Sequence, residues 1–375
     1  MKSGKYKVGM YGGSFCPLHI GHVEVMRRAA KMCEELYIVL SYSRSRDQVP
    51  MEYRYRWILA STVGFSNIHI ICVEDTATSK EEYNDGYWEK GRDEIIRRMG
   101  KRPDVVFCGS DYPDTEDNIY KKLYGCDVMV ADRGNAIGGS GAEHVQLLEN
   151  WNSINVSSSD IRGNEIAMWD YLPAAARPYY VKNIYIVGVE SSGKSTLAKR
   201  LADYFDTNFV SEVGRDVCEV AGGEEYMVPE DFFEIMIRHK AAEIEARKHS
   251  NKLLFIDTEV LTTLYYSKFL VREEELLLNL GHHITDDSGF QCAFSHLADG
   301  IASFNSYDLV LFLEPGSFVQ DGTRNEDIGA NLEKYSRKIQ EEFISRGINF
   351  ISVGGDYEEK FQRAIQVVEK TFFQG

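Results

Sequence analysis

The sequence predicts an α/β protein with two doubly wound domains. Short apolar runs alternate with helical patterns along most of the chain, and the apolar runs show little period-two alternation. Both features are typical of parallel sheets that are covered by helices on both faces. The 375 residues also exceed the usual length of one domain. We therefore expect a first domain over 1–171, a linker over 172–182 and a second domain over 183–375.

The first domain contains five apolar runs that favour strands. We expect strands over 6–12, 36–41, 68–74, 104–109 and 126–132, and helices over 21–35, 53–63 and 88–100. The glycine-rich stretch GNAIGGSG at 134–141 is expected to form a loop in this domain, either a lid over a ligand or a plain connection. The function of the longer segment 133–155 is not predicted.

The second domain begins after two closely spaced prolines. Pro173 and Pro178, with alanines between them, are expected to end the preceding helix. A second β-α series follows, with helical stretches between its apolar runs. Strands are expected over 184–188, 253–257, 307–313 and 348–353.

Composition restricts the classes of function. With 43% hydrophobic and 27% charged residues, the chain is typical of soluble globular proteins, and no run approaches the ~20 apolar residues of a membrane span. Seven scattered cysteines lack paired spacing, which favours reduced thiols in a cytoplasm. The net charge of −16 disfavours binding of nucleic acid, although it also serves solubility. We expect no signal peptide and no helix-turn-helix domain ahead of residue 6. Self-association into a homo-oligomer is left open.

The stretch GVESSGKST matches the P-loop pattern and lies between an apolar run and a helical pattern. Its glycines allow successive backbone N–H groups to face phosphates, and the helix that begins near Lys194 adds its positive end. Lys194 can reach the β- and γ-phosphates, and the Ser195 hydroxyl can bind Mg²⁺. We therefore expect ATP to bind at Gly188, Val189, Glu190, Ser191, Ser192, Gly193, Lys194, Ser195 and Thr196.

Other charged residues of the second half are candidate partners of that site. Asp257 ends an apolar strand and could hold Mg²⁺ or an acceptor hydroxyl; the alternative is a helix N-cap. Glu212 and Arg215 could hold a sugar or phosphate, or form a surface ion pair. Asp321 and Arg324 follow another strand, and Arg324 is either a lid arginine over the transferring phosphoryl group or part of a loop salt bridge.

The stretch YGGSFCPLHIGH near the start of the chain predicts a second anion site. Gly12 and Gly13 follow a strand and allow close backbone approach to a phosphate. His19 and His22 lie three apart at a helix that is expected to begin near Ile20, so both imidazoles would face an anion at its positive end. The alternative for each is a structural histidine. No acidic residue lies beside them, which favours phosphate donors over bases or zinc ligands.

The stretch VSSSDIRGN at 156–164 is the second part of this site. Three serines followed by Asp-Ile-Arg are typical either of a capping motif or of a helix start that faces an anion, with Arg162 one turn further on. Together the two stretches resemble the signatures H-x-G-H and I-S-S-T-x-I-R of the nucleotidyltransferase superfamily. That resemblance implies a Rossmann-like first domain that transfers a nucleotidyl group and releases pyrophosphate, without a covalent intermediate.

The order of the two domains resembles the NadR-type bifunctional family, which joins a nicotinamide-nucleotide adenylyltransferase to a ribosylnicotinamide kinase with a P-loop. The resemblance runs from about residue 6 to 370, and its most specific stretches are EYRYRWIL, DGYWEKG, VESSGKSTL, SEVGRDV, FIDTEVLTT and DGTR. It implies Mg²⁺ as cofactor, and ATP, nicotinamide riboside, nicotinamide mononucleotide and NAD as ligands. Some relatives carry an N-terminal DNA-binding domain and act as repressors, and we do not expect repression here.

The resemblance also implies roles by position. His19, His22, Ser158 and Arg162 would bind ATP phosphates in the first domain, and Lys194, Asp257 and Arg324 would act in the kinase. Glu212, Arg215, Asp257 and Asp321 would bind the kinase acceptor, and Ser195 and Asp257 the metal. The remaining residues of the adenylyltransferase site would be Gly12, Gly13, Ser14, Phe15, Cys16, Arg46, Trp57, Tyr87, Trp88, Ser157 and Ser159. Trp57, Tyr87 and Trp88 are candidates for stacking on nicotinamide, and Trp57 is equally suited to the core.

The sequence departs from the family at two places. Ser159 stands where threonine is usual, and the segment before the serine motif is longer than usual. Two other functions stay open: a regulatory protein that senses NAD and ATP with little turnover, and the same two reactions on another nucleoside and its nucleotide.

Overall fold

The computed structural model describes residues 6–109, 117–131, 156–270, 290–316 and 331–373. The chain divides into two compact units, Met1–Tyr179 and Tyr180–Gly375. Each unit contains a five-stranded parallel sheet among the described residues, so the predicted fold class of two α/β domains is confirmed. The boundary falls inside the segment 172–182, and whether that segment acts as a linker stays a prediction.

The first unit contains a sheet with the strand order β3-β2-β1-β4-β5. This order places the first strand in the centre, and ligands of such sheets bind beyond the carboxyl ends of the strands. The strands are β1 (Tyr6–Gly13), β2 (Cys33–Tyr42), β3 (Ile68–Glu74), β4 (Val105–Gly109) and β5 (Asp127–Ala131). The helices are α1 (Ile20–Met32), α2 (Met51–Thr62), α3 (Asp85–Met99), α4 (Ile119–Tyr124) and α5 (Ser158–Ile161), with short 3₁₀ turns at Lys80–Glu82 and Trp169–Tyr171.

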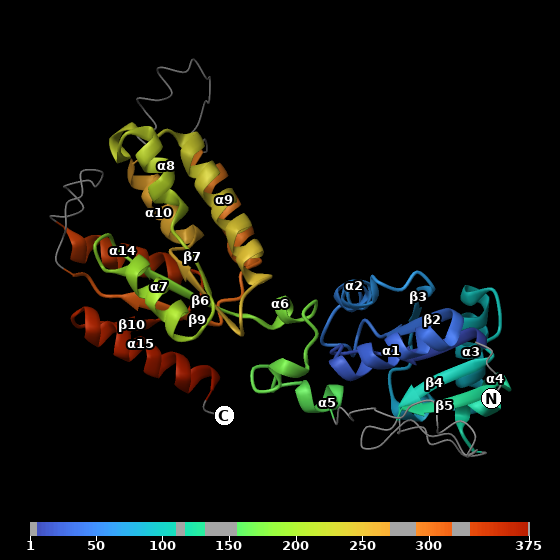
Figure 1. Ribbon diagram of the computed structural model, residues 1–375. Coiled ribbons are helices and arrows are strands. Elements are labelled where there is room, and N and C mark those ends of the chain that lie inside the picture. The colour runs from blue at the N-terminus through green and yellow to red at the C-terminus, as the bar shows by residue number, and fades with distance from the viewer. Residues whose placement is uncertain (1–5, 110–116, 132–155, 271–289, 317–330, 374–375) are drawn as a thin grey trace. The chain divides into compact units, whose positions relative to one another are not determined.

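The second unit contains a sheet with the strand order β10-β9-β6-β8-β7. Its strands are β6 (Lys182–Gly188), β7 (Asn208–Val210), β8 (Leu253–Asp257), β9 (Leu309–Leu313) and β10 (Ile351–Val353). The helices are α7 (Lys194–Tyr204), α8 (Val213–Ala221), α9 (Pro229–Arg247), α10 (Val260–Leu270), α12 (Phe290–Ser303), α14 (Leu332–Ser345) and α15 (Tyr357–Phe372), with a 3₁₀ turn at Glu224–Tyr226. The short α6 (Arg177–Tyr180) lies at the boundary of the units. Helices α8, α9 and α10 lie side by side (Figure 1).

Two differences from the predicted elements have physical reasons. The helix predicted over 21–35 ends at Met32, because β2 begins at Cys33 and pairs with β1 from Tyr6 onward. Cys33 is fully buried in this pairing, so tertiary packing overrides the helical appearance of Cys-Glu-Glu. The edge strand β7 was not predicted, because three residues are too few to show a periodic pattern.

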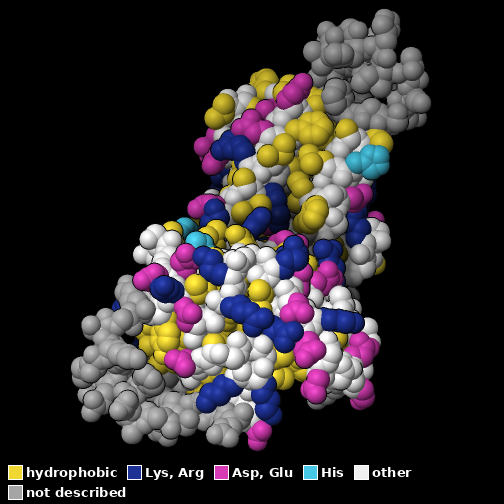
Figure 2. Space-filling model, turned by 90° about the vertical axis from the view of Figure 1, so that its right-hand side faces the viewer, with side chains coloured by type: hydrophobic (Ala, Val, Ile, Leu, Met, Phe, Trp, Pro, Cys, Tyr) yellow, Lys and Arg dark blue, Asp and Glu magenta, His cyan; other side chains and the backbone are white. Residues whose placement is uncertain are grey.

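Apolar side chains of the central strands form the cores. In the second unit Ile184, Ile186, Phe255 and Leu311 pack with residues of α7 and α15. Among the described residues, no helix is long and apolar enough to cross a membrane. Positive and negative side chains are interspersed over the face of the molecule that Figure 2 shows.

Candidate active sites

The loop after β1 places both predicted histidines at the N-terminus of α1. His19 is the N-cap residue, and its backbone N–H donates to Nδ1 of His22 at 3.4 Å. The two imidazole rings stack with their centroids 3.6 Å apart. The expectation that the helix begins near Ile20 is confirmed, and with it the position of both imidazoles at the positive end of the helix.

The turn between the strand and the helix depends on Gly13 and Phe15. The Phe15 ring is buried and lies directly against Gly13, where a Cβ atom would come within 3.0 Å of the ring. Phe15 itself has a φ of 49°. Residues with a side chain rarely adopt this backbone conformation. The packing of the Phe15 ring against Gly13, where no side chain is in the way, stabilises it.

The serine motif packs against this turn, although 141 residues separate them. The Ser158 hydroxyl donates to the Pro17 carbonyl at 2.9 Å. The Arg162 guanidinium donates to the Cys16 carbonyl at 2.8 Å and to the Ser159 hydroxyl at 2.8 Å. Ser157 caps α5 through Asp160, so the capping alternative holds for that serine. The structure therefore brings the two predicted stretches together in one site.

A cavity of about 630 Å³ lies beside the glycine turn. Its wall includes Gly12, Gly13, Ser14, Tyr83, Tyr87 and Trp88. The Tyr83 ring lies 5.3 Å from the Tyr87 ring and 5.7 Å from the Trp88 ring, measured between centroids. These three rings, which we call the aromatic wall, give the cavity a flat apolar side that suits a planar ligand.

One carboxylate holds the aromatic wall in place. Asp75, directly after β3, accepts hydrogen bonds from the Tyr83 hydroxyl at 2.5 Å and the Tyr87 hydroxyl at 2.6 Å. It also pairs with Arg46 at 2.7 Å. Burial would raise the pKa of Asp75, but the hydrogen bonds from Tyr83, Tyr87 and Arg46 outweigh it and lower the pKa below the usual range. Asp75 was missed, although an acid at the carboxyl end of a parallel strand was a usable signal.

Several predicted residues of the first site do not line this cavity, namely Phe15, Cys16, His19, His22, Arg46, Trp57, Ser157, Ser158, Ser159 and Arg162. Arg46 donates to Asp75 and to Tyr83, and so supports the aromatic wall from behind. Trp57 is buried with its ring against Tyr179, which is the core position that the sequence left open. A residue that was missed, Arg54, is fully buried and donates to the Ser14 carbonyl at 2.7 Å.

In the second unit the P-loop follows β6 as predicted. Gly188 has a φ of 149°, and a Cβ atom there would come within 2.7 Å of the Leu313 carbonyl oxygen. Gly193, at φ 91°, is the N-cap of α7. Lys194 begins the helix, and its buried ammonium donates to the Val189 carbonyl at 3.0 Å. A residue with a side chain would be strained at either glycine, and at Gly188 it would also collide with the neighbouring strand.

Asp257 lies next to the P-loop at the end of β8. Its carboxylate is buried, and Oδ2 has no hydrogen-bond partner among the described residues. Burial and the nearby Glu212 raise the pKa of Asp257 to about 6, against the lowering influence of Lys194. The N-cap alternative fails for Asp257, because Glu259 accepts the backbone N–H groups of Leu261 and Thr262 at the start of α10.

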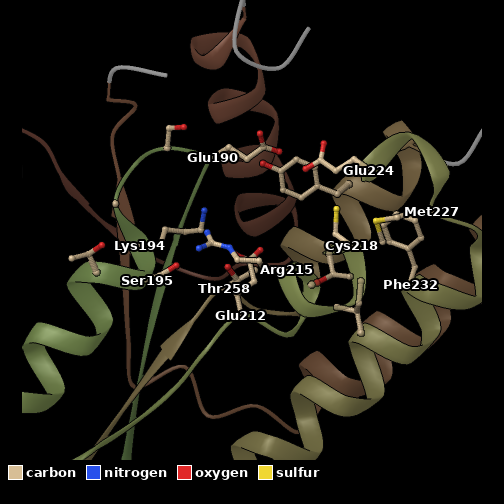
Figure 3. Close-up of a pocket in the computed structure, with 17 residues that line it drawn as sticks. Glu190, Lys194, Ser195, Glu212, Arg215, Cys218, Glu224, Met227, Phe232 and Thr258 are labelled. Carbon is tan, nitrogen blue, oxygen red and sulfur yellow. The ribbon is translucent and has the colours of Figure 1, made fainter. Parts of the chain in front are cut away.

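A second cavity, of about 320 Å³, opens from the P-loop toward α8 and α9. Figure 3 shows the nitrogen atoms of Lys194 and Arg215 close together, with Glu212 and Thr258 beside them. Glu190 and Glu224 lie in another part of the cavity, and Met227 and Phe232 form an apolar side. The cavity therefore has a basic part, where Lys194 and Arg215 lie beside Glu212, and an acidic part, where Glu190 of the P-loop and Glu224 lie near the apolar side.

Tyr266 lies in the acidic part of this cavity. Burial raises the pKa of its hydroxyl well above the ordinary value, and the charges of Glu190, Glu212 and Glu224 raise it further. The charges of three carboxylates therefore act on one aromatic hydroxyl. Sequence reasoning missed Tyr266, Glu224 and Phe232, which carry no motif. Asp321 and Arg324 lie outside the described residues.

Together the two sites define the class of protein, which is a two-domain α/β protein with one nucleotide-type site in each domain. Each unit has a nucleotide-type site at the carboxyl ends of parallel strands, one with an H-x-G-H turn and one with a P-loop. The cytidylyltransferase-like family matches residues 10–164, and the AAA domain family matches residues 183–360.

Comparison with whole proteins gives the particular resemblance. The chain is 27% identical over 382 residues to the trifunctional NAD biosynthesis/regulator protein NadR of Escherichia coli K12. The matched region covers 98% of this chain and 83% of that protein. A crystal structure of a NadR protein in complex with NR is 18% identical with a TM-score of 0.76, over 98% of this chain and 97% of that chain. A second, with NAD and AMP-PNP, has a TM-score of 0.75. The predicted resemblance to NadR-type proteins is confirmed.

Proposed function

We propose that this chain is a bifunctional enzyme of NAD salvage. The second unit transfers the γ-phosphoryl group of ATP to nicotinamide riboside, and the first unit transfers the adenylyl group of ATP to the resulting mononucleotide, which gives NAD and pyrophosphate. The similarity to NadR over nearly the whole chain supports both steps.

The distribution of charge in the second cavity is the observation that carries the proposal. Nicotinamide riboside joins a neutral sugar to a flat, positively charged pyridinium ring. The part of the cavity with Glu190 and Glu224 offers negative charge, and Tyr266 and Phe232 offer aromatic faces. Cations bind well in such surroundings. At the other end, Lys194 and Arg215 suit the phosphates of ATP.

The phosphoryl transfer follows from the residues between these ends. The Asp257 carboxylate, buried at the end of β8 beside the P-loop, would accept the proton of the ribosyl hydroxyl as it attacks. Lys194 stabilises the charge on the transferred group, and the backbone N–H groups of the P-loop hold the leaving phosphates.

The same residues fit Mg²⁺. Asp257 Oδ2 is a buried oxygen without a hydrogen-bond partner among the described residues, and the Ser195 hydroxyl lies near it. Mg²⁺ in kinase sites commonly takes one or two such protein oxygens together with phosphate oxygens and water. Bound there, it would neutralise charge on the phosphates. No group of three or more metal-binding side chains occurs in the described ranges, and a site of this kind does not need one.

Adenylyl transfer in the first unit needs positioning more than bond chemistry. His19 and His22, at the positive end of α1, would hold the triphosphate while the mononucleotide phosphate attacks in line. Ser158 and Arg162 fix the loop that carries the histidines. The aromatic wall would stack on the nicotinamide ring.

Both alternatives are less well supported. A sensor with little turnover has no use for a buried Asp257 with an open oxygen beside a P-loop lysine. A neutral nucleoside as acceptor would leave Glu190 and Glu224 in the acidic part of the cavity without a cation. A cytoplasmic location fits the seven cysteines, all of which are present as thiols. The oligomeric state stays open.

The experiment incubates the purified chain with ATP, Mg²⁺ and nicotinamide riboside and separates the products by chromatography. We expect nicotinamide mononucleotide first and NAD after it. Uridine, a neutral nucleoside, is the matched acceptor control and should react far more slowly. Formation of neither product would reject the proposal, and equal rates with uridine would reject the role of the acidic end.

A further inference from the structure

A buried lysine far along the chain contacts the outer side of the P-loop. Lys360 lies near the start of α15 with 6% of its surface exposed. Its ammonium donates to the Ser192 carbonyl at 3.1 Å and to the Glu314 carbonyl at 2.8 Å. Ser192 belongs to the P-loop, and Glu314 follows β9 directly. One side chain thus joins the phosphate loop to the carboxyl end of β9.

This position is unfavourable for a cation on general grounds. Burial lowers the pKa of Lys360, with only the nearby Glu314 acting in the other direction. Among the described residues no carboxylate lies within ion-pair distance of it. It also stands close to the N-terminus of α15, where the helix dipole repels positive charge. The two carbonyl contacts must offset these costs, because a buried ammonium without them would be strongly destabilising.

The contact with Ser192 fixes the direction of a peptide group. A trans peptide is planar, so its C=O and N–H bonds point in opposite directions. When the Ser192 carbonyl points toward Lys360, the N–H of Gly193 must point away from Lys360. Gly193 and Lys194 line the cavity at the end where phosphates would bind. Gly193 has no side chain and adopts a φ of 91°, a conformation that glycine reaches as readily as others, so its own sterics do not hold this peptide group in one orientation.

We propose that Lys360 is a positioning residue of the phosphate loop, which holds the Ser192–Gly193 peptide group with its N–H turned toward the nucleotide. Lys360 touches no substrate in this arrangement and acts through the backbone. The proposal rests on the P-loop part of the proposed function and is independent of which acceptor the second unit uses.

The test compares Lys360→Met with Lys370→Met, which removes an exposed lysine from the other end of the same helix. In the full chain, the KM for ATP in the kinase reaction should rise about tenfold for Lys360→Met, the scale of one lost hydrogen bond to a charged group. The KM for nicotinamide riboside and the rate of adenylyl transfer should change less than twofold. Lys370→Met should resemble wild type in all three.

A binding measurement separates this proposal from the acceptor assignment. Calorimetry with ADP alone needs no acceptor, and the part of ADP binding that Lys194→Ala removes belongs to the P-loop. That part should weaken about tenfold in Lys360→Met. Lys360→Arg, which keeps a cationic donor, should stay within threefold of wild type even if the methionine variant melts early. Unchanged ADP binding in folded Lys360→Met, or equal weakening in Lys360→Arg, would overturn the proposal. An equal rise in both KM values would show general loosening and overturn it as well.

Discussion

Replacement of Asp75 by asparagine should impair binding of nicotinamide mononucleotide while leaving ATP binding nearly intact. Asp75 accepts hydrogen bonds from two tyrosine hydroxyls and from one guanidinium N–H group. It also accepts one from the Ala77 backbone N–H, at 3.1 Å. Asparagine keeps one oxygen, and its amide group cannot accept from the donors that face the other carboxylate oxygen. At least one ring of the aromatic wall therefore loses its anchor.

The size of the effect follows from these contacts. A hydrogen bond to a charged group contributes about 1.5–3 kcal/mol, and partial exposure of the Arg46–Asp75 pair reduces its share. We take a loss of about 1.4 kcal/mol in binding free energy, which raises the KM for the mononucleotide about tenfold. Because the pKa of Asp75 lies below its usual range, the carboxylate is ionised at both pH 6 and pH 8, and the effect should be the same at both.

The assay follows pyrophosphate release at saturating ATP while the mononucleotide concentration is varied. Tyr83→Phe and Tyr87→Phe should each give a smaller rise in KM, since each removes one of the anchors. Glu89→Gln is the matched control, because Glu89 is an exposed acid of α3 outside the cavity wall. If Asp75→Asn raised the KM for ATP as much as that for the mononucleotide, or raised neither, the aromatic wall would not be the acceptor site.

Two further predictions test the two sites separately, and a third tests the pH dependence of stability. Lys194→Ala should lower mononucleotide formation ~10²–10³-fold and spare adenylyl transfer, and His22→Ala should do the reverse; loss of both activities in a folded Lys194→Ala would require one shared site. Gly188→Ala should abolish the kinase alone, because its Cβ would meet a strand carbonyl at 2.7 Å, whereas Gly300→Ala, with open space around it, should be harmless in activity assays. Burial raises the pKa of Glu259 from 4.5 to about 8, so the folded chain binds a proton that the unfolded chain has released. The melting temperature in EDTA should therefore fall as pH rises from about 4.5 to 8, and Glu259→Gln should show a shallower fall.

The sequence predicted the sheets well because buried parallel strands are continuous apolar runs. The strands over 68–74 and 253–257 have the predicted bounds, since polar residues flank both runs. The start of β2 was wrong, because Glu34 and Glu35 look helical in isolation and become strand only through pairing with β1.

The sites were predicted to the extent that their contacts are local. Lys194 and Val189 are five residues apart, and the motif contains both. Arg54 and Ser14 are 40 apart, and Lys360 and Ser192 are 168 apart. Arg54 lies in the family stretch EYRYRWIL, but no local pattern indicates its partner, and none distinguishes Lys360 from any other basic residue of a helix. Asp75 was visible as a strand-end acid, but its tyrosine partners become apparent only when the loop folds back.

The contacts of Arg162 and Lys360 also set the order in which the chain can become active during synthesis. The H-x-G-H loop leaves the ribosome early, yet Ser158 and Arg162, which donate to carbonyl groups of this loop, follow about 140 residues later. The P-loop likewise precedes Lys360 by 168 residues. Closing such long loops is entropically unfavourable until the intervening sheet has formed. A nascent or prematurely terminated chain therefore has incomplete phosphate sites. The site of each unit is complete only when the last segment of that unit has packed against it.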